Sequence, residues 1–352
     1  MTRKEQIKRV SHLFSAALLC TAMVLASTAF ASSPTVKGNS CAALDVQADV
    51  RPDAGGPPTK VTVGIRIMDL MGISDVSQTL TGDFAVMLTW TDPRLAHLQG
   101  CQIALDTIWS PGLVFFNSGE KSRERPRETR IGPGGQVRYL QRWYGTFATY
   151  HNLRDFPFDK QTFQISLFSL YWPEKDLKLV VDELFTGWRE LLNISNWSID
   201  GVEGTTNRSY SEAQDDFFSR YDLNISAHRM TRFYMWKVML PLCLIVFMSW
   251  CVFWISPAQF GPQVDLSATS MLTLIAFIFA TTNMVPELGY LTRLDLFIVG
   301  STILVFLALI ETAVTVYQVS HERKEQVLRM DRACRLLFPL AFGILIVVVF
   351  LR

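Results

Sequence analysis

The chain has 352 residues, which is more than one ordinary domain of roughly 150 residues would need. Its 33 basic and 32 acidic side chains leave a formal net charge of +1, so the charge gives no reason to expect a nucleic-acid partner. Hydrophobic residues make up 49% of the sequence and gather in its last third, whereas charges and strand-like patterns lie mostly before Arg232. This asymmetry predicts a soluble half followed by a membrane half.

The N-terminus has the pattern of a secretory signal peptide. Basic residues come first, an apolar run follows from 13 to 26, and Ala29-Phe-Ala31 matches a small-x-small cleavage site. We therefore expect residues 1–31 to be removed, with an uncleaved anchor as the alternative. Export would place the soluble half in an oxidising space. Cys41 and Cys101 are then candidates for a disulfide, although sequence alone cannot show that they lie close enough.

Residues 32–232 are expected to form an exported β-sandwich. Short strand-like runs recur, with turns rich in Gly and Pro between them, which is typical of an antiparallel sandwich. The runs are 61–67, 84–90, 108–116, 137–143, 163–171, 177–181, 197–201 and 221–227. We find no catalytic triad, P-loop, paired-carboxylate signature or metal-ligand spacing, so we expect neither an enzyme nor a bound metal or cofactor.

Residues 233–352 are predicted to form a membrane domain with four spans. The apolar segments are 233–255, 262–284, 294–317 and 334–351. The loop 318–333 carries Arg323, Lys324, Arg329 and Arg332, and the positive-inside rule places it in the cytoplasm. Four spans then return the C-terminus to the side of the soluble half.

The second span is unusual for a lipid-facing helix because it carries a polar stripe. Residues at helical spacing of four and three form one face, from an acid through an apolar middle to a polar end. They are Asp265, Thr269, Leu272, Ala276, Phe279 and Asn283. A ring of such helices would line a water-filled path with a charged mouth and a hydrophobic waist. A bundle helix whose hydroxyl groups bond to its own backbone is the alternative.

Four segments in order resemble the pentameric ligand-gated ion channels. Trp90-Thr-Asp-Pro-Arg-Leu95 looks like their W-x-D-x-R-L motif, and Ile108-Trp-Ser-Pro to Asn117 looks like I-W-x-P-D-x-x-x-x-N, with Gly112 in place of Asp. Asp155-Phe-Pro-Phe-Asp159 resembles the F-P-x-D loop, and Arg229 to Pro241 resembles the entry to the first membrane helix. Animal members bracket the F-P-x-D loop with two cysteines. This chain has Thr149 and Phe163 at those places, so it resembles the bacterial members.

The resemblance implies a homopentamer around a central pore, with an agonist pocket between subunits. Matching by motif gives one wall as Phe116, Tyr171, Tyr210 and Phe218, and the neighbouring subunit's wall as Met87, Arg138 and Trp143. Aromatic faces favour a cation such as an amine, whereas Arg138 would suit a carboxylate. The candidates that couple the two halves are Asp159, Arg229, Pro286 and Tyr290.

The sequence thus predicts a cation-selective ligand-gated channel that lies in a bacterial inner membrane, with its N-terminal domain and C-terminus in the periplasm. Five Asp265 carboxylates at the cytoplasmic mouth would attract monovalent cations. The expected partners are other copies of the chain, the bilayer and a small agonist of the amine or amino acid class. An anion-selective channel and a non-conducting, membrane-anchored sensor are the alternatives.

Overall fold

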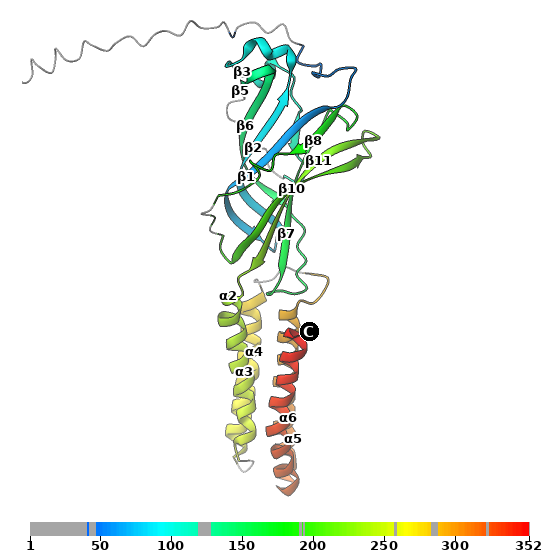
Figure 1. Ribbon diagram of the computed structural model, residues 1–352. Helices are drawn as coiled ribbons and strands as arrows, with labels where there is room; N and C mark the ends of the chain where they lie inside the picture. Colours follow the sequence, from blue (N-terminus) through cyan, green and yellow to red (C-terminus); the bar gives the residue numbers. More distant parts are fainter. Residues whose placement is uncertain are drawn as a thin grey trace, which may run out of the picture. The chain divides into compact units, whose positions relative to one another are not determined.

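A computed structural model describes residues 41, 47–118, 128–189, 192, 194–256, 259–282, 288–321 and 324–351. The expected signal peptide, Asn283 and Pro286 lie outside these residues. Within them, the chain forms two β-sheets followed by apolar helices (Figure 1). The predicted order of a β-sandwich and then a helical membrane domain is confirmed.

The first sheet has the strand order β3-β5-β6-β2-β1-β8, with β9 also on β1. Its strands are β1 (Thr59–Ser74), β2 (Thr79–Thr91), β3 (Gln102–Ala104), β5 (Glu128–Ile131), β6 (Gln136–Ala148), β8 (Leu177–Val181) and β9 (Gly187–Trp188). Most pairs are antiparallel, but β1 pairs in parallel with β8 and β9. The expectation of a purely antiparallel sandwich was therefore wrong at this edge.

The second sheet has the strand order β10-β11-β7-β4. Its strands are β4 (Leu113–Phe115), β7 (Lys160–Ser169), β10 (Trp197–Ser211) and β11 (Asp216–Arg229). Alternating apolar residues of both sheets meet in one core, where every second residue of β1 from Val61 to Ile67 is fully buried. The period-2 pattern of the sequence thus directs side chains to a shared interior.

The predicted strand at 108–116 is strand only at its end. β4 covers Leu113–Phe115, whereas Trp109 is buried in an irregular segment and contacts Trp90 edge to face. Pro111 has no N–H to donate to a neighbouring strand, and Gly112 has a φ of +57°. An apolar run can therefore be a buried loop when such residues interrupt it.

The membrane half contains α2 (Arg232–Tyr234), α3 (Leu240–Cys251), α4 (Phe260–Thr281), α5 (Arg293–Ser320) and α6 (Lys324–Phe350). A π-helical turn at Met235–Met239 precedes Pro241. It joins α2 to α3, and such a turn relieves the backbone near a residue that cannot donate a hydrogen bond. Four helical segments of the described chain are long and apolar enough to cross a membrane: Arg232–Trp254, Gly261–Thr281, Arg293–Ser320 and Glu325–Phe350. Helices α3 to α6 run beside one another (Figure 1).

The fourth helix begins ten residues before the expected span. α6 starts at Lys324, so most of the predicted loop 318–333 is helical. Its charged residues mark the end of the apolar span but do not interrupt a helix, because Lys, Arg, Glu and Gln are good helix formers. Hydropathy located the apolar part of this helix and missed its polar extension.

Candidate ion pathway, junction and ligand pocket

The predicted stripe of α4 lies on one exposed face of the chain. Asp265, Thr269 and Ala276 are exposed, and the side chains of Leu272 and Phe279 are 68% and 75% exposed. Two large apolar side chains on an uncovered face need other copies, lipid or a pore to surround them. The structure thus brings the five described stripe residues together on one face.

The opposite face of α4 packs into the helical bundle. Gln263, Ser267, Ser270 and Leu274 are buried at the same four-three spacing. Ser267 and Thr312 of α5 form a hydroxyl–hydroxyl bond of 2.8 Å. Thr269, in contrast, donates to the carbonyl of Asp265 at 2.7 Å, which leaves its oxygen turned to the exposed side. One face of α4 therefore packs against the other helices of the bundle, and the opposite face is exposed in the single chain.

The segment between β6 and β7 contacts the helices. The Phe156 carbonyl accepts from the Leu294 N–H at 3.2 Å, and its ring lies edge to face on Tyr234 with centroids 4.8 Å apart. The Tyr290 hydroxyl accepts from the Leu153 N–H at 3.1 Å. Phe156 and Leu153 belong to the same buried apolar cluster as α3 and α5. This segment is thus built into the helical core, and the predicted coupling residue Tyr290 lies at it.

Arg229, at the end of β11, holds the predicted coupling pair. Its guanidinium donates to both carboxylate oxygens of Asp159 at 2.7 and 3.0 Å and to those of Asp75 at 2.7 and 2.9 Å. It also lies over the rings of Trp197 and Phe156, at 4.2 and 4.7 Å. Burial alone would lower the pKa of Arg229, but the two carboxylates raise it above its usual value. The guanidinium is therefore a permanent buried cation.

The sequence did not reveal Asp75 as the second partner of Arg229. Burial would raise the pKa of Asp75, but hydrogen bonds and charges from His151 and Arg229 hold it below its ordinary value. His151 is itself fully buried, with Nδ1 3.3 Å from Asp75. Asp75 lies 154 positions before Arg229, and no local pattern joins residues so far apart.

Three predicted ligand residues meet at a small cavity on the second sheet. Phe116, Tyr210 and Phe218 line about 120 Å³ together with Phe168 and Arg220. Phe116 is 71% exposed, so the cavity is open to the surface of the chain. Phe168 and Arg220 were not predicted. The alternation of β7 and β11 around Phe168 and Phe218 is the signal that could have found both.

Arg220 gives this cavity a polar end. Its Nε lies 2.9 Å from the fully buried Asp222, which also accepts from Ser166 and Asn207. The guanidinium is thus held in place by the sheet while it remains partly exposed. The aromatic rings and the fixed cation together can contact a small molecule that has an apolar body and an anionic group.

The three residues predicted for the neighbouring subunit's wall of the pocket do not all lie on one surface. Met87 and Arg138 lie on the outer face of the first sheet, where Thr89 is paired with Arg138. Trp143 pairs with the buried Phe84 and points into the sandwich against Phe115. A strand places successive residues on opposite faces, so Trp143 cannot share a surface with Arg138 five positions away. That part of the prediction was wrong.

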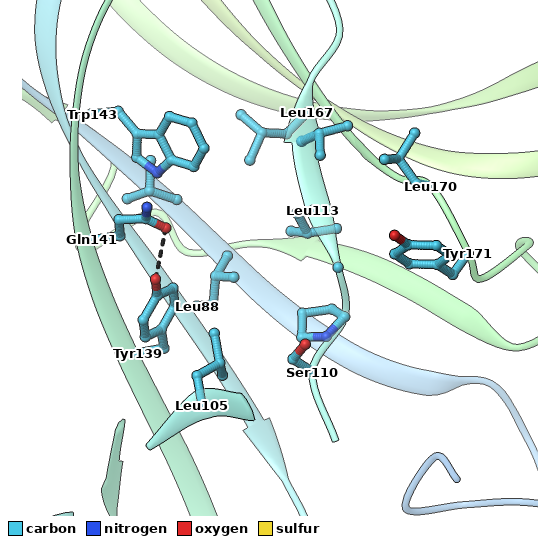
Figure 2. A pocket seen from close by; sticks show the side chains of 14 residues that line it. Leu88, Leu105, Ser110, Leu113, Tyr139, Gln141, Trp143, Leu167, Leu170 and Tyr171 are labelled. Atoms are coloured by element: carbon cyan, nitrogen blue, oxygen red, sulfur yellow. Dashed lines mark hydrogen bonds between the residues drawn. The ribbon is translucent and has the colours of Figure 1, made fainter. Parts of the chain in front are cut away.

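Trp143 and Tyr171 line a different cavity, inside the subunit (Figure 2). This cavity holds about 300 Å³ between the two sheets. Tyr139 and Gln141 face it from β6 and share a 2.7 Å hydrogen bond. A side chain at Gly112 would meet the Tyr171 ring at 2.8 Å, so the glycine leaves room for that ring. Tyr171 is therefore separate from the aromatic cavity at Phe116.

The cysteines that the structure describes fall into two groups. Cys41 and Cys101 each take part in a disulfide, whereas Cys243, Cys251 and Cys334 are free. The pairing of Cys41 with Cys101 stays a prediction. In the described residues, we find no group of three or more His, Cys, Asp or Glu side chains that could hold a metal ion.

Two family models match the chain. Residues 45–230 match the neurotransmitter-gated ion-channel ligand binding domain, and residues 238–329 match the neurotransmitter-gated ion-channel transmembrane region. The first match alone covers more than half of the chain. The chain belongs to the neurotransmitter-gated ion-channel family. It is therefore a multi-pass membrane protein of a family of ligand-gated channels, which are not enzymes.

Relatives of this neurotransmitter-gated channel chain differ in what their names say they respond to. It is 25% identical to a proton-gated ion channel of Gloeobacter violaceus, over 83% of this chain and 82% of the relative. It is 27% identical to the gamma-aminobutyric acid receptor subunit rho-1 of Mus musculus, over 91% and 70%. It is 28% identical to subunit rho-2 of Homo sapiens, over 81% and 64%. These relatives belong to the same family as this chain, but their names do not agree on one agonist.

Proposed function

We propose that this chain forms a cation-selective ligand-gated channel, a homopentamer whose pore is lined by the stripe from Asp265 to Phe279. The single observation that carries the proposal is the division of α4 into a packed face and an exposed face with an acid at one end. Pore helices need one face against their own bundle and one against water. A membrane-anchored sensor without a pore gives no reason for this exposed acid.

The orientation follows from the sequence. Residues 1–31 would be the signal peptide, 32–232 the periplasmic domain and 233–352 the membrane domain of a bacterial inner-membrane protein. The basic residues at the start of α6 would then lie in the cytoplasm, together with the end of α4 that carries Asp265. A ring of carboxylates at this mouth concentrates cations and repels anions.

We further propose an agonist between subunits, at the aromatic cavity of Phe116, Tyr210 and Phe218. The nearby Arg220 favours a ligand that carries a carboxylate, and the rings favour an ammonium group. Amino acids carry both groups, as does the gamma-aminobutyric acid named for two relatives. Acid pH belongs in the same screen, because another relative is named a proton-gated channel.

Purified protein in planar bilayers tests this proposal. Small amines, amino acids and acid pH would be applied in turn, and the reversal potential measured in an asymmetric salt gradient. We expect the reversal potential to follow the cation and Asp265→Ala to weaken that preference. Glu325→Gln, which removes an exposed acid on α6, is the matched control and should leave selectivity unchanged. A native reversal potential that follows the anion would support the anion-selective alternative instead.

A further inference from the structure

A buried histidine is attached to the junction between the sheets and the helices. His151 has no exposed surface, and its ring packs edge to face on Phe163 with centroids 5.1 Å apart. Its Nδ1 lies 3.3 Å from an Asp75 oxygen, and its Nε2 lies 2.8 Å from the Thr149 hydroxyl. Asp75 in turn accepts two hydrogen bonds from Arg229. The imidazole is therefore one contact away from the coupling arginine.

The charges of this cluster do not balance when His151 is neutral. Asp75 and Asp159 supply two carboxylates, and Arg229 supplies one guanidinium. The ring of Tyr234 also lies near the arginine, and a tyrosine hydroxyl with its ordinary pKa of about 10 carries no charge between pH 5 and 8. One negative charge is thus in excess in a buried place, where an unbalanced charge is costly. A proton on His151 would bring the cluster to neutrality.

The hydrogen bonds around His151 can accommodate this proton. In either charge state Nδ1–H can donate to Asp75. Nε2 accepts from the Thr149 hydroxyl when the ring is neutral and donates to the same oxygen when the ring is charged. A hydroxyl hydrogen can rotate, so neither state leaves a ring nitrogen without a partner. Proton uptake then changes the charge of the cluster and breaks none of its contacts.

We propose that His151 is a proton-binding site that strengthens the junction when it is occupied. Histidine is the side chain that ordinarily changes its charge between pH 5 and 8. A charged His151 would bind Asp75 more firmly, which neutralises the cluster around Arg229 and Asp159. Asp159 also accepts from Gln161 at 2.7 Å, and Gln161 donates to the carbonyl of Asn152 at 2.7 Å. The proton would therefore stabilise the segment 152–159 that contacts the helices.

Asp75 does not titrate in the same range. Its folded pKa lies below its ordinary value, so its contribution to stability is present above an ordinary aspartate's pKa of about 4. That contribution is lost only as the pH falls through the lowered pKa. Asp75 therefore stays negative in a comparison between pH 5.5 and pH 8.5.

The test uses the full chain in detergent and two glutamine variants. In His151→Gln the side chain can still donate to Asp75 but cannot take up a proton. The matched control is His228→Gln: His228 forms a similar pair with Asp200 at 2.6 Å, but both side chains are 45% exposed. The first measurement is an NMR titration of ¹³C-labelled histidine. The second is hydrogen exchange of the 152–159 segment at pH 5.5 and 8.5, corrected for intrinsic rates.

We expect one histidine signal, absent in His151→Gln, to titrate between pH 5 and 8. At pH 5.5 the segment should exchange at least about threefold more slowly in the native chain than in His151→Gln, with equal rates at pH 8.5. His228→Gln should match the native chain at both pH values. Thr149→Val leaves the charged Nε2–H without an acceptor, so the signal should titrate at lower pH by at least about half a unit.

Two outcomes would overturn the proposal. A His151 signal that stays constant from pH 5 to 9 would show that no proton binds there. A signal that titrates while the segment exchanges equally in the native chain and in His151→Gln at pH 5.5 would show that the proton does not act on the junction. The native chain's own titration keeps the test valid even where a variant folds poorly.

Discussion

Arg229 shows how one residue can hold two parts of a chain together. Its side chain is 1% exposed, so its charge is stabilised by the protein and not by water. Two carboxylates and two aromatic faces supply that stabilisation: Asp159 and Phe156 lie in the segment between β6 and β7, whereas Asp75 and Trp197 lie in two other segments of the chain. Removing one partner therefore lowers the free energy of unfolding by more than the value of the lost contact, because the buried cation remains without that partner.

Asp159→Ala should destabilise the protein by about 3–5 kcal/mol, since it leaves Arg229 with a single carboxylate in a buried place. The expected readouts are a lower unfolding temperature in detergent and less assembled protein in the membrane. Asp155→Ala is the matched control, because its pair with Arg293 is 60% exposed on the aspartate side. That change should cost less than about 1 kcal/mol. Equal losses for the two variants would show that burial of the Arg229 pair does not matter.

Site residues could be predicted only where a motif or an alternation marked them. Phe116 lies within the motif from Ile108 to Asn117, Phe218 was placed just before the last predicted strand of the exported half, and the structure brings the two together. Trp143 was assigned by its motif position alone, and its strand parity, visible in the sequence, already places it on the inner face. No motif or alternation identifies Asp75 and His151, because their contacts in the cluster around Arg229 depend on how three distant segments pack.

At the scale of an element, α4 carries two patterns at once. Its buried residues recur at the same helical spacing as its exposed stripe, but about half a turn away. The middle of the stripe is apolar, and its Leu272 and Phe279 are the largest exposed side chains there. A narrow apolar ring in a pore excludes water and blocks ions without touching side chains. We therefore expect Leu272 or Phe279 to form the closed gate of the proposed pore.

Leu272→Ser should therefore make the channel leak or open more easily, because a hydroxyl lets water enter the apolar ring. The measurement is ion flux from proteoliposomes without agonist, compared with the native chain. Leu336→Ser is the matched control: Leu336 is 76% exposed on α6, outside the stripe, so its replacement should not add flux. Unchanged flux and unchanged activation in Leu272→Ser would remove Leu272 from the gate, and Phe279 would become the candidate.

The elements themselves were predictable to different degrees. All eight strand-like runs contain strand residues, because alternation reports directly which side chains face a core. The ends were less predictable: β10 continues to Ser211 through mostly polar residues, and α6 begins at Lys324. In both cases backbone pairing or helix propensity extends the element beyond its apolar part.

At the scale of the whole molecule, a single chain leaves its membrane helices incompletely covered. Only 22% of the most apolar part of α4 and 11% of that of α6 is buried within the chain. Lipid can cover an apolar helix such as α6, but it does not suit a face that carries Asp265 and Thr269. Other copies of the chain, arranged around a shared water-filled axis, would place the polar stripe of α4 against water and leave the apolar surface of α6 against lipid. The ring proposed above thus follows from the contrast between α4 and α6.

Cysteine labelling distinguishes the two environments. Thr269→Cys and Ala276→Cys place a thiol on the stripe, and Val347→Cys places one on α6, where Val347 is 52% exposed in the single chain. The free Cys243, Cys251 and Cys334 would first be replaced by alanine, while Cys41 and Cys101 are disulfide-bonded and do not react.

In proteoliposomes, a charged, water-soluble thiol reagent should label both stripe positions when the pore is open and leave Val347→Cys unlabelled, because thiols react as thiolates and these form in water and not in lipid. Mass analysis should show five chains in each assembled particle. If both stripe positions resist the reagent under every condition that conducts ions, α4 does not line the path. If all three positions react alike, the contrast between a wet axis and a lipid-facing surface is lost, and with it the reason to place α4 at the centre of a ring.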